Sequence, residues 1–199
     1  MGIRQMTSRA VFLDRDGVVV ELVWDDADAA FEGPTAGDDV RLVTGAADAI
    51  RRIRSLDYRT VVVSNQPGAA KGKASQEDLL EAHERVVGLL AEQGVMIDDY
   101  RYCLHHPDAR DPALAQACDC RKPRPGMLLE AAAELDLDLA RSWMIGDSDV
   151  DAEAGRSAGC RTILVENPLS AHRRQRDGAA DYRVGDVGHA VEIVAREDG

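Results

Sequence analysis

Two aspartates at the end of an apolar run have the residue types and spacing of a metal and nucleophile site. Asp14 and Asp16 follow the run 11–13, with Arg15 between them and a glycine at position 17. If the strand continues through them, both carboxylates point to one side and Arg15 points away. Two carboxylates this close repel each other unless a cation lies between them, and Mg²⁺ takes such ligands together with phosphate. An ordinary acidic turn is the alternative for this motif alone.

Two later segments carry groups that bind phosphate. A β-branched run at 60–63 ends in Ser64 and Asn65, whose hydroxyl and amide can donate hydrogen bonds to phosphoryl oxygens. Arg121 and Lys122 supply two adjacent cations. A fixed ammonium neutralises the charge of a transferring phosphoryl group, although solvated surface charge is the simpler explanation for this pair alone.

A second acidic pair closes the apolar run 143–146. Asp147 follows the glycine at the end of this run, and Asp151 lies four residues later. In a helix that spacing places both carboxylates on one face. N-capping of that helix by Asp147 is the alternative.

In this order the segments resemble the haloacid dehalogenase-like phosphatases. The pattern of that superfamily is DxD, then a strand-terminal Ser or Thr, then Lys, then GDxxxD, and the resemblance runs from about Ala10 to Val194. Each motif is weak alone, and the ordered set is specific because the motifs agree with one another.

Length and charge fit a small-molecule enzyme. The 199 residues predict a single domain over 1–199, and the net charge of −12 makes nucleic acid and anionic membranes poor partners. The first eight residues contain no continuous apolar segment of a secretory signal, and no later stretch approaches membrane-spanning length. A monomeric cytoplasmic enzyme is the expectation.

Short apolar runs alternate with amphipathic segments along the chain. This alternation predicts an α/β fold, a doubly wound parallel sheet with helices on both faces and the site at the carboxyl ends of the strands. A capping box of Ser75 and Asp78 marks one helix start. The remaining chain leaves no room for a large cap domain, and the acidic stretch 21–39 is interpreted as a long loop or flap over the site. The predicted helices are 45–56, 75–93, 125–135 and 149–158, and the strands are 11–13, 60–64, 99–103, 143–145 and 162–165.

Three of the four cysteines lie with histidines in one segment. Cys103 and His105 alternate on a predicted strand, so both can meet one ion, and Cys118 with Cys120 can complete its coordination. Three Cys and one His form a common structural zinc set. His106 is an alternative to His105 as ligand, and disulfides are the rival interpretation, although nothing indicates an oxidising compartment.

The segments 103–107 and 118–127 resemble one family in particular, the D,D-heptose 1,7-bisphosphate 7-phosphatases. The resemblance implies a capless enzyme with zinc in the loop at about 103–120. It also implies removal of the 7-phosphate of D-glycero-D-manno-heptose 1,7-bisphosphate, in nucleotide-activated heptose synthesis. Histidinol-phosphate phosphatases share the zinc loop and are the alternative. A catalytically silent phosphosugar-binding protein is a third hypothesis, disfavoured because the catalytic acids are all present.

The same resemblance implies a role for each candidate residue. Asp14 is the nucleophile that becomes an aspartyl phosphate, and Asp16 is the general acid and base. Ser64 and Lys122 bind the phosphoryl group, with Asn65 beside them.

The resemblance also implies the metal ligands and the substrate contacts. Mg²⁺ is held by Asp14, Asp147 and the carbonyl of Asp16, while Asp151 orients the waters of the ion. Arg121 contacts the substrate. The 1-phosphate of the substrate is expected on Arg121, with Arg124 or Lys73 beside it. The flap at 19–39 departs from the family pattern, so the sequence predicts the reaction more firmly than the sugar or its anomer.

Overall fold

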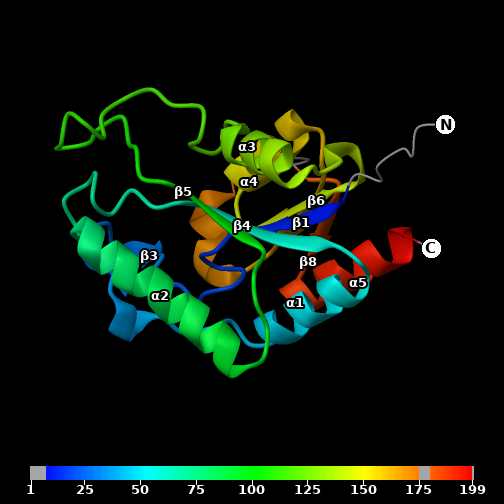
Figure 1. The fold of residues 1–199 in the computed structure, drawn as a ribbon. Coiled ribbons are helices and arrows are strands. Elements are labelled where there is room, and N and C mark those ends of the chain that lie inside the picture. The colour runs from blue at the N-terminus through cyan, green and yellow to red at the C-terminus, as the bar shows by residue number, and fades with distance from the viewer. Residues whose placement is uncertain (1–7, 175–179, 199) are drawn as a thin grey trace.

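The computed structural model describes residues 8–174 and 180–198, which form one six-stranded sheet between two layers of helices (Figure 1). Every strand pairing in this sheet is parallel, and the order is β5-β4-β1-β6-β7-β8. Central strands of such sheets are covered on both faces, which explains the continuous apolar runs in the sequence. The strands are β1 (Ala10–Leu13), β4 (Arg59–Asn65), β5 (Asp99–Cys103), β6 (Trp143–Gly146), β7 (Arg161–Val165) and β8 (Tyr182–Val184).

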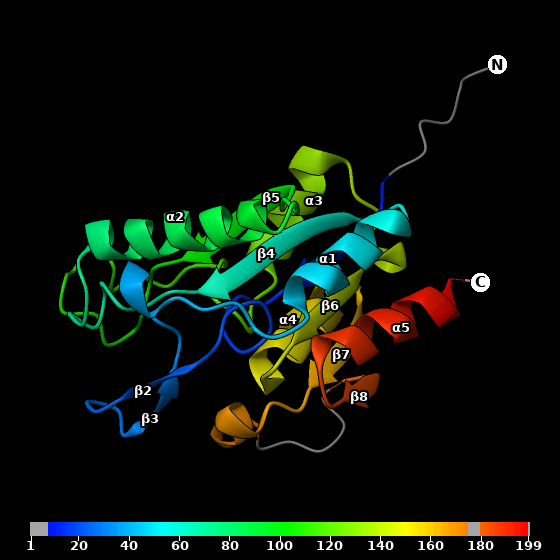
Figure 2. The ribbon, with the colours of Figure 1, turned by 90° about the horizontal axis from the view of Figure 1, so that it is seen from below.

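Helices cover both faces of the sheet, as Figures 1 and 2 show. On one face lie α1 (Ala46–Ser55), α2 (Gln76–Glu92) and α5 (Val187–Glu197), and on the other α3 (Gly126–Leu135) and α4 (Asp149–Ala158). The side chains of β1 alternate between the two cores. The doubly wound α/β prediction is therefore confirmed.

The strand order places the predicted catalytic residues together. Asp14 directly follows β1, Ser64 lies near the end of β4, and Asp147 directly follows β6. These three strands are adjacent, with β1 in the middle. Since they run parallel, their carboxyl ends meet at one edge of the sheet.

Two helix starts follow the physics of capping. The Ser75 hydroxyl accepts from the backbone of Asp78 and the Asp78 carboxylate accepts in return, which confirms the predicted capping box. The α4 helix uses the same arrangement with Ser148 and Asp151. Asp147 is therefore not the N-cap, and its carboxylate stays available at the strand end.

The flap differs from the expected long loop. Within it, β2 (Val23–Asp25) and β3 (Ala30–Glu32) pair antiparallel as a short hairpin, and a 3₁₀ turn η1 (Gly37–Asp39) follows. Strands of three residues give no periodicity in the sequence. Trp24 and Phe31 stack edge to face across the hairpin, with ring centroids 5.4 Å apart.

The C-terminal β8 and α5 were not predicted. The α5 helix nonetheless carries standard signals, with an N-cap at Asp186 and buried Val187, Val191 and Val194 at helical spacing. No helix in the described residues is both long and apolar enough to cross a membrane. Of the first eight residues, in which the sequence showed no signal-like run, 1–7 lie outside the described residues.

Candidate active site

Three buried carboxylates form a cation-binding cluster at the edge of the sheet. Oxygens of Asp14, Asp147 and Asp151 all lie within 4.8 Å of one another. Neither carboxylate oxygen of Asp147 has a hydrogen-bond partner among the described residues. Buried, unpartnered carboxylate oxygens are costly unless a cation is bound. The donor set therefore fits a hard cation such as Mg²⁺.

The electrostatics of this cluster agree with its geometry. Burial and then the neighbouring charges of Asp14 and Asp151 raise the pKa of Asp147 to about 8. Burial and Asp14 also raise the pKa of Asp151, although Lys122 opposes the shift. A divalent cation would favour the ionised forms of these carboxylates.

Lys122 contacts two of the three carboxylates of the cluster. Its ammonium contacts Asp14 Oδ1 at 2.9 Å, Asp151 Oδ1 at 2.6 Å and the carbonyl of Val63 at 2.7 Å. Burial alone would lower the pKa of Lys122, but the charges of Asp14 and Asp151 outweigh it and the pKa is raised. Lys122 is therefore a fixed, buried cation.

Asn65 holds the backbone of Lys122. Its amide nitrogen donates to the backbone carbonyl of Lys122, and its amide oxygen accepts from the backbone N–H of Lys122, both at 3.0 Å. Asn65 thereby fixes the position of Lys122. The second hydrogen of its amide nitrogen can still donate to a phosphoryl oxygen, so the phosphoryl contact stays a prediction.

The expectation for Arg15 is wrong. The β1 strand ends at Leu13, so strand alternation does not extend to Arg15. Its buried side chain turns back, and Nε donates to Asp16 Oδ1 at 2.7 Å while Nη2 donates to the carbonyl of Pro34 at 3.0 Å. Arg15 thereby fixes one oxygen of the Asp16 carboxylate.

Gln66, which the sequence reasoning left unused, fixes the other oxygen. Its amide nitrogen donates to Asp16 Oδ2 at 2.6 Å and to Ser64 Oγ at 2.9 Å. Because the Ser64 oxygen accepts from Gln66, its own O–H remains free to donate to a phosphoryl oxygen. In the sequence, only its position directly after Ser64 and Asn65 at the end of β4 marks Gln66.

Two glycines let backbone approach these acids closely. A Cβ atom at Gly17 would lie 2.0 Å from Asp147 Oδ2, and Gly17 also has a φ of +90°. A Cβ atom at Gly33, in the flap, would lie 2.3 Å from the Asp16 carboxylate. The flap backbone therefore covers the acid directly.

A pocket of about 340 Å³ opens over the cluster, within the usual range for small-molecule sites. Asp14, Asp16 and Ser64 line its floor, and the predicted contacts Arg121 and Lys73 line it as well. Arg124 is not among the described residues that line it. The Arg124 guanidinium instead donates to the carbonyl of Cys118 at 2.8 Å.

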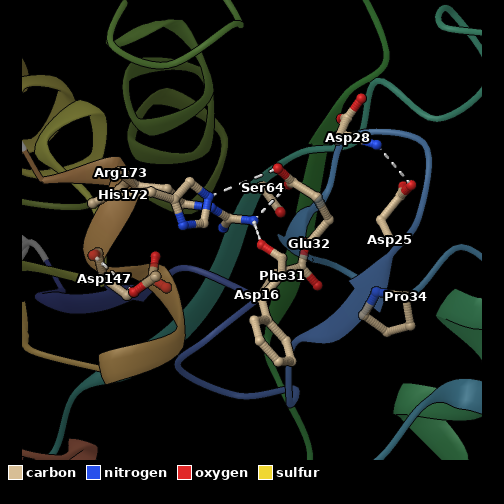
Figure 3. Close-up of polar contacts among 12 residues, drawn as sticks. Asp16, Asp25, Asp28, Phe31, Glu32, Pro34, Ser64, Asp147, His172 and Arg173 are labelled. Carbon is tan, nitrogen blue, oxygen red and sulfur yellow. Dashed lines mark hydrogen bonds and ion pairs between the residues drawn. The ribbon is translucent and has the colours of Figure 1, made fainter.

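Arg173 is a further pocket residue that the sequence did not reveal. It ends the 3₁₀ segment η3 (Pro168–Arg173), and its Nη2 contacts Glu32 Oε2 at 2.6 Å and the Phe31 carbonyl at 3.1 Å. Figure 3 shows Arg173 extending from η3 toward this part of the hairpin. No motif marks Arg173, because only the tertiary fold brings η3 to the pocket.

The segment around η3 also braces the backbone of the cation cluster. Arg174 Nη1 donates to the carbonyl of Asp147 at 3.0 Å, and Asn167 Nδ2 donates to the carbonyl of Gly17 at 3.2 Å. Two of the backbone turns that carry the site are therefore tied to one segment.

A second cluster joins the predicted zinc ligands. Cys103, His105, Cys118 and Cys120 each offer a ligand atom, and these atoms lie within 4.8 Å of one another. The Sγ of Cys103 is 3.6 Å from that of Cys118 and 3.1 Å from that of Cys120. All four residues can thus meet one tetrahedral ion, so the cluster can bind zinc.

The contacts of this cluster favour His105 over His106 as the fourth ligand. His105 Nδ1 lies 3.3 Å from Cys120 Sγ, and its Nε2 is held by Gln116 at 2.8 Å. His106 Nδ1 instead accepts from the backbone of Asp108. All four cysteines are free thiols in this structure, which favours a metal site over the disulfide interpretation. Cys120 directly precedes Arg121 and Lys122 in the sequence, so an ion bound by this cluster would anchor the loop that carries them.

Comparison with known proteins agrees with this site. The HAD-hydrolase-like family profile matches residues 119–190. A D-glycero-β-D-manno-heptose-1,7-bisphosphate 7-phosphatase from Photorhabdus laumondii is 36% identical over 190 residues, covering 94% of this chain and 97% of that protein. The phosphatase of the same name from Escherichia coli is 31% identical over 188 residues, covering 94% of both chains.

A solved structure shows the same architecture. The D,D-heptose 1,7-bisphosphate phosphatase of B. bronchiseptica, complexed with magnesium and phosphate, superimposes with a TM-score of 0.77. It is 30% identical, and the match covers 95% of this chain and 99% of that one. The parallel sheet and the acidic cluster at its carboxyl edge define a hydrolase of the haloacid dehalogenase-like class. Within it, the chain belongs to the D-glycero-β-D-manno-heptose-1,7-bisphosphate 7-phosphatase family.

Proposed function

We propose that this chain is a Mg²⁺-dependent phosphatase that removes the 7-phosphate of D-glycero-D-manno-heptose 1,7-bisphosphate. The observation that carries the proposal is the contact of Asp14 with buried Lys122 beside the Asp147 carboxylate, at the floor of a pocket of about 340 Å³. The names and coverage of the relatives support the sugar.

Asp14 acts as the nucleophile. Its carboxylate attacks the phosphorus of the 7-phosphate, the bond between phosphorus and the sugar oxygen breaks, and the leaving alkoxide takes a proton from Asp16. Water then attacks the aspartyl phosphate and gives its proton to Asp16, which releases phosphate and restores Asp14. The clamp of Arg15 and Gln66 holds Asp16 in place for both transfers.

Lys122 and the Ser64 hydroxyl bind the phosphoryl oxygens during both steps. Asp14, Asp147 and the carbonyl of Asp16 would hold Mg²⁺. When bound, the ion neutralises charge so that a carboxylate can approach a phosphate dianion. Asp151 is held by Ser148 and Lys122, which suits a role outside the direct ligands.

The 1-phosphate stays outside the catalytic floor. Arg121 and Lys73 line the same pocket and can bind this second anion, and a guanidinium fork gives two aligned bonds to phosphate. Binding energy from the remote phosphate would position the 7-phosphate for attack.

Histidinol phosphate is the competing substrate, since its phosphatases share the zinc loop. Kinetics on both anomers of the heptose bisphosphate, on heptose 7-phosphate and on histidinol phosphate separate the two functions. We expect the highest kcat/KM on one anomer of the bisphosphate. A higher value on histidinol phosphate would replace the proposal with the alternative.

We further propose that Cys103, His105, Cys118 and Cys120 bind one structural zinc ion. Cys118→Ser is expected to lower the zinc content and to raise KM by about tenfold, because the loop that carries the two cations loosens. Elemental analysis and kinetics check this. Cys160→Ala, which removes a buried thiol outside the cluster, should keep full zinc content. Metal-free protein purified without chelator would contradict the assignment.

A further inference from the structure

The flap hairpin places its own carboxylates on cations of the pocket. Lys73 Nζ lies 2.6 Å from Asp25 Oδ2 and 2.6 Å from Asp28 Oδ2, and Lys71 Nζ lies 3.2 Å from Asp28 Oδ2. Asp25 and Asp28 lie close together on the hairpin in Figure 3. All four side chains line the same pocket as Asp14.

The residues of these ion pairs are partly exposed, so solvent or a ligand can reach them. The side chains of Asp25 and Asp28 are 24% and 32% exposed, and Lys73 is 20% exposed. Ion pairs this open to solvent contribute little net stability. A phosphate dianion carries more charge than a carboxylate and offers more acceptor oxygens to an ammonium. Such a group can therefore displace the two aspartates.

The hairpin would not detach when those pairs break. Its other strand keeps the contacts of Glu32 and the Phe31 carbonyl with Arg173. The cross-strand stacking of Trp24 on Phe31 lies within the hairpin itself. Release of Asp25 and Asp28 would thus free Lys71 and Lys73 while the flap stays over Asp16.

We propose that Asp25 and Asp28 stand in for the second phosphate of the substrate on Lys73 and Lys71, so that the hairpin is a built-in competitor that a bisphosphate displaces. The inference rests on the proposed function, because it concerns the remote phosphate. A monophosphate bound on the catalytic floor has no second phosphate to displace the two aspartates and leaves the hairpin in place. The hairpin acids thereby set the affinity for bisphosphates alone.

Equilibrium binding tests this proposal with fructose 1,6-bisphosphate and fructose 6-phosphate as probes. Calorimetry is carried out with Mg²⁺ in the Asp14→Asn background, which blocks turnover. Adding Asp25→Asn and Asp28→Asn is expected to lower the Kd for the bisphosphate by roughly three- to tenfold, a range that follows from the usual strength of exposed ion pairs. The Kd for the monophosphate should change by less than about twofold.

The matched control is Asp26→Asn with Asp38→Asn. This control removes two charges from the same segment, and neither carboxylate contacts a cation among the described residues. The Asp26 carboxylate accepts from Trp24 Nε1 instead. Both affinities should stay near those of the background protein. An equal gain in the control would assign the effect to net charge and overturn the proposal.

Lys73→Gln should have the opposite effect and weaken bisphosphate binding. This change should remove the affinity advantage of the bisphosphate over the monophosphate. If the double aspartate variant does not fold, Asp28→Asn alone should give a smaller gain in the same direction. Weaker or unchanged bisphosphate binding in the aspartate variants would show that these acids only order the lysines. Since no heptose is used, a failure of the heptose assignment would leave this test intact.

Discussion

Asp14→Asn is expected to lower kcat by at least about a thousandfold, because an amide cannot form the aspartyl phosphate. The fold should survive. Asp14 lies in a buried cluster with Asp147 and Asp151, so removing its charge relieves repulsion, while Lys122 keeps Asp151 as a partner. The melting temperature in chelator should therefore not fall.

Steady-state kinetics and thermal melting of freshly purified protein check this expectation. Asp26→Asn is the control, because it makes the same chemical change on the exposed hairpin and should keep full activity. More than a few per cent residual activity in Asp14→Asn would rule out Asp14 as the nucleophile.

Lys122→Gln should damage both stability and catalysis. The change leaves Asp14 and Asp151 without their shared cation, and breaking a buried ion pair costs about 3 kcal/mol or more. It also removes a charge that binds the phosphoryl group, so kcat/KM should fall by about a hundredfold to a thousandfold.

Denaturant unfolding and kinetics measure the two effects. Arg52→Gln, which removes an exposed cation from α1, should change neither quantity appreciably. Wild-type kcat/KM in a folded Lys122→Gln protein would exclude Lys122 from phosphoryl binding.

The sheet could be predicted because buried parallel strands are continuous apolar runs with polar groups at their ends. The runs before Asp14, Ser64 and Asp147 are confirmed as adjacent strands β1, β4 and β6. The hairpin could not be predicted, because its three-residue strands carry no periodicity and depend on one aromatic pair and on contacts with the pocket. The α5 helix carries a capping residue and apolar spacing in its sequence, so it is the part of this unit that a sequence can predict.

The site was predictable where chemistry is local in sequence. The carboxylates and the zinc-type ligands are close in space as expected. The contacts of Arg15 could not be predicted, because β1 ends at Leu13 and strand alternation does not extend to Arg15. Arg173 could not be found, because its contacts with Glu32 join segments about 140 residues apart and follow no motif. Supporting contacts of this kind arise from packing, which a single sequence does not display.

Phosphorus NMR of the reaction products tests the central claim most directly. With D-glycero-D-manno-heptose 1,7-bisphosphate and Mg²⁺, the account predicts that the 7-phosphate signal is replaced by inorganic phosphate while the 1-phosphate signal remains. Loss of the 1-phosphate signal, or no hydrolysis of either anomer by protein that carries both metals, would contradict it.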